Sequence, residues 1–249
     1  MNAIQFSSIM FACVFGGALA GMFVRAMLPG HHLESDSRDS IKVGMGFVGT
    51  MVALVLGLLV ASAKNAYDTQ GTEVTQISAN MVLLDRVLAH YGPETATARA
   101  MLKETATSFT ARLWASDTAH TTSAPSTKGD ALFDEIESLA PKDDAQRGLK
   151  GQAVSMLLEI ARTRWLMYEQ RTTGVSMPLL IMLISWLTLI FISFGLFAPR
   201  NLTVVGSFFV SALSVSGAVL LIVEMYSPFT GLIRISQAPM QAAIEALGR

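Results

Sequence analysis

Four long stretches of the chain are almost entirely apolar: residues 8–28, 43–63, 175–198 and 202–223. The hydrocarbon core of a bilayer is about 30 Å thick, so a helix needs about 20 apolar residues to cross it. Each stretch reaches that length, and the second and third contain no charged residue. Helices in soluble cores rarely stay apolar on every face for so long. The pattern therefore predicts four transmembrane helices.

The four spans are expected as two hairpins separated by a polar segment, residues 64–174. An even number of crossings places this segment and both termini on the same side of the membrane. Lys and Arg residues near the spans are nearly balanced between the two sides, so charge does not decide the orientation. Because no Lys or Arg precedes the first apolar stretch, we expect a retained helix rather than a cleaved signal peptide.

A heptad pattern continues beyond the second span. Apolar residues recur at steps of three, four or seven, as in the buried seam of a coiled coil, and Gln70 takes the one polar position in this seam. The seam residues are Tyr67, Val74, Ile77, Met81, Leu84, Leu88 and Tyr91. The same register continues backwards through Ala63, Val60, Leu56, Ala53, Gly49 and Gly46. The pattern predicts one helix over residues 43–91, about 70 Å long at 1.5 Å per residue, with a stalk seam for helix packing or assembly.

The remaining central segment also shows helical periodicity. Helices are expected over residues 94–114 and 130–139, with a loop at 115–129, and Asp143 or Asp144 is expected to cap a further long helix. The tail, residues 224–249, ends in a short amphipathic helix, which we expect on the membrane surface or on the central domain. The predicted fold is all-α: a four-helix integral membrane protein with a helical extramembrane stalk domain at 64–174.

Composition agrees with a membrane location and narrows the chemistry. The chain is 51% hydrophobic and 15% charged, whereas an average soluble domain carries about 25% charged residues. Its net charge of -1 gives no basic footprint for nucleic acid. A single cysteine, Cys13, excludes an intramolecular disulfide framework. Since no nucleophile is spaced with a base, we expect neither an enzyme nor a cofactor.

One short segment contains residue types that bind metals: His31 and His32 are followed closely in the sequence by Glu34 and Asp36. Adjacent histidines on a loop do not set a tetrahedral site, so a solvated turn is favoured over a metal centre.

Small residues gather on one side of the second span, at Gly46, Gly49, Thr50, Ala53 and Gly57. Two interpretations are open. Small residues let helix backbones approach closely in lipid, as we also expect for Gly17 and Gly21. Alternatively, the same residues line a pore, where they leave room for water or an ion.

Three charged residues border the apolar spans: Arg25, Arg200 and Glu224. Positions at helix ends favour side chains that reach the membrane interface or pair there. The alternative is a ring of charge, repeated once per subunit of an oligomer, that attracts ions.

Several sequences resemble a bacterial family described as bestrophin-like: residues 53–64, 83–94, 144–147, 163–166 and 194–201. The resemblance covers nearly the whole chain. Bestrophins are oligomeric anion channels with four membrane helices per subunit, a mainly helical cytosolic domain and a pore lined by the second helix. The resemblance implies a bacterial inner-membrane protein whose central domain and termini are cytoplasmic, with the face from Gly46 to Gly57 on the pore axis.

Two functional hypotheses follow. The first is a passive ion channel, with anions favoured by the resemblance. The second is a non-conducting scaffold or signalling protein whose helical stalk binds a partner. The partners expected in either case are the lipid bilayer and further copies of the chain, with inorganic ions added for a channel and no nucleic acid.

Overall fold

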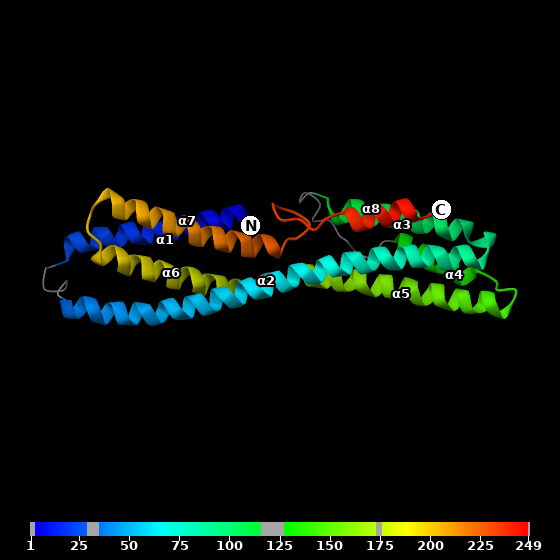
Figure 1. The fold of residues 1–249 in the computed structure, drawn as a ribbon, viewed down its shortest axis with the longest axis horizontal. Coiled ribbons are helices and arrows are strands. Elements are labelled where there is room, and N and C mark those ends of the chain that lie inside the picture. The colour runs from blue at the N-terminus through cyan, green and yellow to red at the C-terminus, as the bar shows by residue number, and fades with distance from the viewer. Residues whose placement is uncertain (1–2, 29–34, 116–126, 173–175, 249) are drawn as a thin grey trace. The chain divides into compact units, whose positions relative to one another are not determined.

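The computed structural model describes residues 3–28, 35–115, 127–172 and 176–248, and within them every regular element is a helix. The elements, labelled in Figure 1, are α1 (Ala3–Met27), α2 (Ser35–Tyr91), the 3-10 helix η2 (Pro93–Thr95), α3 (Ala96–Leu113), α4 (Thr127–Ser138), α5 (Asp144–Thr172), α6 (Met177–Phe197), α7 (Leu202–Met225) and α8 (Ala238–Ala246).

The chain divides into two compact units. Unit 1 comprises Met1–Ala66 and Val175–Tyr226, and unit 2 comprises Tyr67–Gly174 and Ser227–Arg249. Helix α2 contributes its N-terminal part to unit 1 and its C-terminal part to unit 2.

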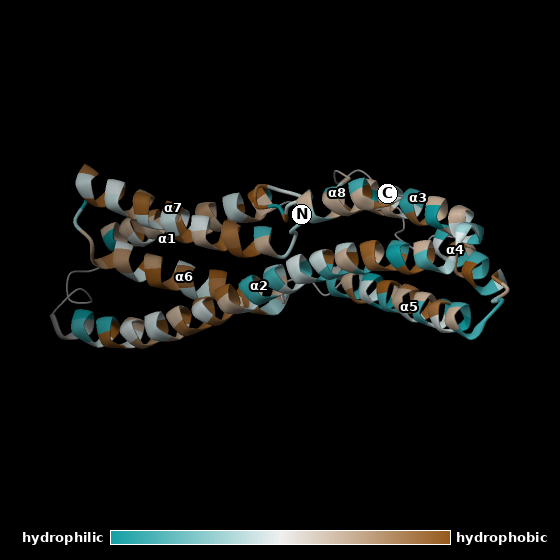
Figure 2. Cartoon of the chain, turned by 45° about the vertical axis from the view of Figure 1, so that its right-hand side comes forward, coloured by the Kyte–Doolittle hydropathy of each residue, from teal (hydrophilic) through white to brown (hydrophobic). Residues whose placement is uncertain are grey.

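Unit 1 contains the apolar helices. Helices α1, α6, α7 and the first part of α2 are long and apolar enough to cross a membrane, which confirms the prediction of four such helices. In Figure 2 their ribbons carry many brown turns, the hydrophobic end of the scale, between white and pale ones.

Helices α1 and α6 approach so closely that only glycine fits at the contact. A Cβ atom on Gly21 would lie 2.1 Å from the carbonyl oxygen of Ile192, and one on Gly195 would lie 2.1 Å from that of Ala18. A Cβ atom on Gly17 would also be tight, at 3.1 Å from the Thr188 side chain. The expected packing role of Gly17 and Gly21 is thereby confirmed.

Helix α7 packs on another side of α1. The Ser7 hydroxyl donates a hydrogen bond of 2.9 Å to the Ser216 carbonyl oxygen. Two rings of α1 pack edge-on against Phe209: the centroids of Phe11 and Phe15 lie 5.4 and 5.6 Å from it. Helix α1 thus contacts both C-terminal spans, α6 and α7.

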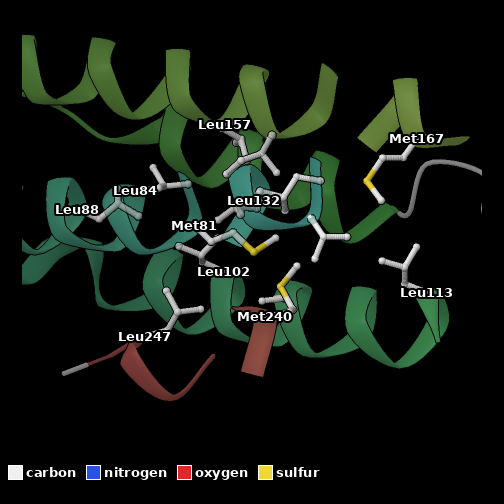
Figure 3. Close-up of a cluster of buried hydrophobic side chains, with 14 of the residues drawn as sticks. Met81, Leu84, Leu88, Leu102, Leu113, Leu132, Leu157, Met167, Met240 and Leu247 are labelled. Atoms are coloured by element: carbon white, nitrogen blue, oxygen red, sulfur yellow. The ribbon is translucent and has the colours of Figure 1, made fainter. Parts of the chain in front are cut away.

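Unit 2 is built around a core from α2, α3, α4, α5 and α8 (Figure 3). The α2 side chains Met81, Leu84 and Leu88 are at most 1% exposed and pack within this core. Helix α2 ends at Tyr91, and Gly92 takes a φ of 139°, which favours glycine, before Pro93 starts the next turn. The predicted cap of α5 is Asp143, whose carboxylate accepts a 2.7 Å hydrogen bond from the Gln146 amide.

The C-terminal segment packs on unit 2. Met240 and Leu247 are buried in its core, and the Trp114 indole donates a 2.9 Å hydrogen bond to the Ile235 carbonyl oxygen. Of the two locations expected for the tail, the structure shows the one on the central domain.

A buried ion pair holds the end of this segment. Arg99 donates two hydrogen bonds of 2.8 Å to Asp85, and the Gly248 amide donates a third, of 3.2 Å, to the same carboxylate. Lys103 donates to the Leu247 carbonyl oxygen at 3.0 Å. The carboxylate of Asp85 is therefore shared between α3 and the tail.

Replacing Asp85 by Asn should lower the free energy of unfolding of unit 2. The Asp85 and Arg99 side chains are 2% and 22% exposed, so the lost pair leaves Arg99 with partial access to water. We expect a loss of about 2 kcal/mol, below the ~3–5 kcal/mol typical of a fully buried pair. Thermal unfolding of the full chain, with Trp165 and Trp186 replaced by Phe so that Trp114 reports on unit 2, measures it.

The matched control is Asp144→Asn. Asp144 pairs with Arg147, and the two side chains are 94% and 69% exposed, so this change should have almost no effect. Equal destabilisation by the two variants would contradict a special role for the Asp85 pair.

Candidate pore-lining surface of helix α2

Within unit 1, helix α2 packs through a narrow stripe. Val52, Leu59 and Ala63 are at most 6% exposed and belong to the unit 1 core. Half-buried residues extend the stripe at Met45, Val48, Val55 and Leu56. The other sides of α2 have few contacts in the described part of the chain.

The predicted small residues lie outside this packing stripe. Gly46, Thr50, Ala53 and Gly57 are exposed and Gly49 is half-buried; we call these five the small-residue row. A Cβ atom added to Gly46, Gly49 or Gly57 would meet no atom of the described residues within 4 Å. In contrast to Gly21 and Gly195, these glycines do not serve close packing within one chain. The row is therefore open to solvent, lipid or another copy of the chain.

A row of bulky apolar side chains lies beside the small-residue row. Val43, Phe47, Leu54 and Leu58 are 76%, 68%, 69% and 70% exposed. The exposed surface of α2 thus has a small half and a bulky half. In a bilayer, the bulky half is suited to acyl chains and the small half to close approach by a helix, water or an ion.

In the unit 1 part of α2, most residues that pack against other helices lie one position before those predicted by extending the heptad seam backwards. The seam predicted Val60, Ala53 and Gly46 as contact positions, yet these are exposed. The chain instead packs through Leu59, Val52 and Met45, together with the shared positions Ala63 and Leu56. Both registers are apolar because the whole span is, so periodicity alone does not distinguish them.

Lysines extend the small-residue row at both ends. Helical steps of three and four residues lead from Lys42 through Gly46, Gly49, Ala53, Gly57 and Val60 to Lys64. Lys42 forms an exposed ion pair of 3.1 Å with Asp39, and Lys64 is exposed. The row thus has an apolar middle and cationic ends.

The two arginines predicted at the interface bind helix ends. Arg25 of α1 donates to the carbonyl oxygen of Ala198, just after α6, and Arg200 donates at 2.9 Å to the carbonyl oxygen of Met22 in α1. Cations are favourable near helix C-termini, where the helix dipole is negative. Glu224, the third predicted charge, is 5% exposed near the end of α7. Within one chain, the two arginines lie together and Glu224 lies at the opposite end of α7.

The seam residues lie inside unit 2. Val74, Ile77, Met81, Leu84, Leu88 and Tyr91 are at most 4% exposed, and Tyr67 packs against the same core half-buried. Their apolar surface is used within the chain, so pairing of two copies through this seam would require these contacts to be replaced.

The histidine cluster, from His31 to Asp36, has no side chain among those described. In the described residues, no group of three or more His, Cys, Asp or Glu side chains is placed to hold a metal ion.

One contact in unit 1 was not predicted from sequence. The hydroxyls of Ser62 in α2 and Tyr226, directly after α7, lie 3.0 Å apart in a hydrogen bond. A lone serine at the end of an apolar span carries no signal for this partner, which is 164 residues away in the chain.

Comparison with known proteins identifies the family. The model of the family named Bestrophin-like domain matches residues 12–240, which includes most of α1, the other three apolar helices and most of unit 2. No curated protein and no solved structure matches the chain. The match covers most of the sequence, and the chain belongs to the bestrophin-like family.

Proposed function

We propose that the chain is the subunit of a homo-oligomeric membrane channel that passes ions passively, with the small-residue row of α2 on the pore axis. The main support for this proposal is that the small-residue row is not covered by other described residues of the same chain. The bestrophin-like domain supports it, since the bestrophin family includes anion channels.

The low burial of α2 favours an assembly. Only 11% of the residues in the most apolar segment of α2 are buried, against 33% in the corresponding segment of α1 and 39% in that of α6. In a ring of copies, each α2 can turn the same face towards the symmetry axis. Glycine, alanine and threonine on that face would leave space for water and ions, while the bulky row would contact neighbouring helices or lipid.

The cationic ends of the row favour anions. Around a symmetry axis, Lys42 and Lys64 each become a ring of positive charge at one end of the apolar stretch. Rings of Lys or Arg attract anions and repel cations at a pore mouth.

The scaffold alternative has less support. In that hypothesis the heptad seam of the stalk binds the partner, but the seam side chains pack in the core of unit 2. A partner on the stalk would have to use other residues.

Replacing Ala53 by Phe should abolish chloride flux from liposomes that contain the purified protein. The side chain is exposed in the middle of the small-residue row, so a ring of phenylalanines would fill the pore without disturbing packing within the chain. Flux is measured with a chloride-selective electrode, and assembly is checked by size-exclusion chromatography.

Gly46→Phe and Gly44→Phe form a matched pair for this experiment. Both glycines are exposed, and in the described part of the chain no atom lies within 4 Å of an added Cβ atom. They lie on roughly opposite sides of α2, since successive residues differ by about 100°. Only Gly46→Phe should reduce flux. Wild-type protein that assembles correctly but conducts no ion would contradict the channel.

Replacing Lys64 by Glu should shift the selectivity of the channel towards cations. The reversal potential in a potassium chloride gradient across a planar bilayer measures this change. Lys128→Glu, which reverses an exposed lysine in unit 2, is the control and should leave the potential unchanged. An unchanged potential in Lys64→Glu would remove the proposed cationic ring.

We place unit 2 and both termini in the cytoplasm and the four spans in the bacterial inner membrane, because this is the orientation of bestrophins. In a Cys13→Ala background, a cysteine at exposed Ser155 of α5 should react with a membrane-impermeant maleimide only after the cells are permeabilised. A cysteine at exposed Thr203, at the start of α7, should react in spheroplasts. The reverse pattern would invert the orientation.

A further inference from the structure

Unit 2 contains a cavity of about 220 Å³ between α3, α4 and α5. Its inner wall includes Leu102, Leu132 and Leu157, which point into the core shown in Figure 3. Leu158, Trp165 and Tyr168 of α5 also line the cavity and are 54%, 52% and 37% exposed. The cavity therefore extends from the apolar core to the surface along α5.

The size and lining suit a small apolar group. An apolar cavity of about 150 Å³ is enough to bind benzene, and this one is larger. A hydrocarbon chain of medium length or an aromatic ring would gain burial there.

One wall of the cavity carries a half-buried cation, Arg164. The guanidinium of Arg164 lies 5.1 Å from the centre of the Phe109 ring, and its Nε atom is buried without a hydrogen-bond partner among the described residues. Burial lowers the pKa of Arg164, as does the nearby charge of Arg112, while Asp130 acts in the opposite direction. Arginine nevertheless stays protonated in proteins, so the site keeps its charge.

Among the described residues that line the cavity, the charged side chains leave an excess of one positive charge. Arg112, Arg164 and Asp130 all line the cavity. A buried donor without a partner is costly, and a charged acceptor would satisfy it with a strong hydrogen bond. A singly charged anion would also neutralise the excess.

We propose that this cavity is a binding site for a singly charged amphipathic anion, whose anionic oxygens meet Arg164 and whose hydrocarbon part enters the apolar interior. The ligand is a free carboxylate with a medium-length chain or a singly charged bilayer lipid, which share this chemistry. The site uses residues of unit 2 alone and does not depend on ion conduction.

The test is binding of radiolabelled octanoate to the full chain in nanodiscs of phosphatidylcholine, by equilibrium dialysis with empty nanodiscs subtracted. We expect saturable binding of one octanoate per chain. Arg164→Gln should weaken it at least about tenfold, because a charge-assisted hydrogen bond is lost. Arg162→Gln is the matched control: it makes the same change on an exposed arginine of α5 outside the cavity, and should bind as wild type.

Two further measurements keep the proposal testable if Arg164→Gln fails to fold. Ala161→Phe keeps the arginine but fills the cavity that Ala161 lines, and should prevent binding. On the wild-type protein, octylammonium should not compete with octanoate. Replacing part of the phosphatidylcholine by phosphatidylglycerol separates the sources: reduced octanoate binding indicates a bilayer lipid, and unchanged binding indicates the free carboxylate.

Three results would overturn the proposal. They are octanoate binding no higher than in empty nanodiscs, equal binding by Arg164→Gln and Arg162→Gln, and competition by octylammonium as strong as by octanoate. A further outcome would assign this surface to a second subunit instead. In that case, Trp165→Cys in a Cys13→Ala background would form a disulfide between two copies of the chain, and the protein would bind no octanoate.

Discussion

Helix contacts in a bilayer depend on close packing, because lipid tails are as apolar as the side chains and give no hydrophobic drive for association. In unit 1, most of this packing involves α1. Its glycines contact the backbone of α6, and its N-terminal half contacts α7 through Ser7 and two phenylalanine rings. Helix α2 joins the unit through one stripe only. The exposed remainder of α2 follows from this division of contacts.

A different principle organises unit 2, where water is the surrounding solvent in the proposed orientation. Four helices and the C-terminal segment bury one apolar core, and the buried pair of Asp85 and Arg99 binds the end of that segment. The heptad seam of α2 is one side of this core. A heptad pattern is therefore compatible with a mixed helical domain as well as with a coiled-coil stalk, because both bury a narrow apolar stripe.

Long-range periodicity made the helices predictable from sequence, whereas contact partners were not. Four apolar stretches and the run from Val74 to Leu88 are regular enough to predict membrane-length helices and a buried face. Gly17 and Gly21 of α1 and Gly46 and Gly49 of α2 both repeat at helical steps of three or four residues, yet only the α1 pair meets a neighbouring backbone among the described residues. Which set packs depends on where α6 lies, and no local pattern contains that information. The cavity in unit 2 was also missed, since its residues come from separate segments and each is an ordinary core or surface residue alone.

The close backbone contacts at Gly21 and Gly195 have a consequence for how the sequence can vary. At each glycine, the atom that blocks a side chain is a backbone carbonyl oxygen of the opposite helix. A larger residue here cannot be accommodated by shrinking a neighbouring side chain, because the blocking atom is present whatever residue carries it. Second-site suppressors of such a change would have to move a whole helix, which also moves the arginines that bind its end. These two positions are therefore under a constraint that compensating point mutations do not relieve.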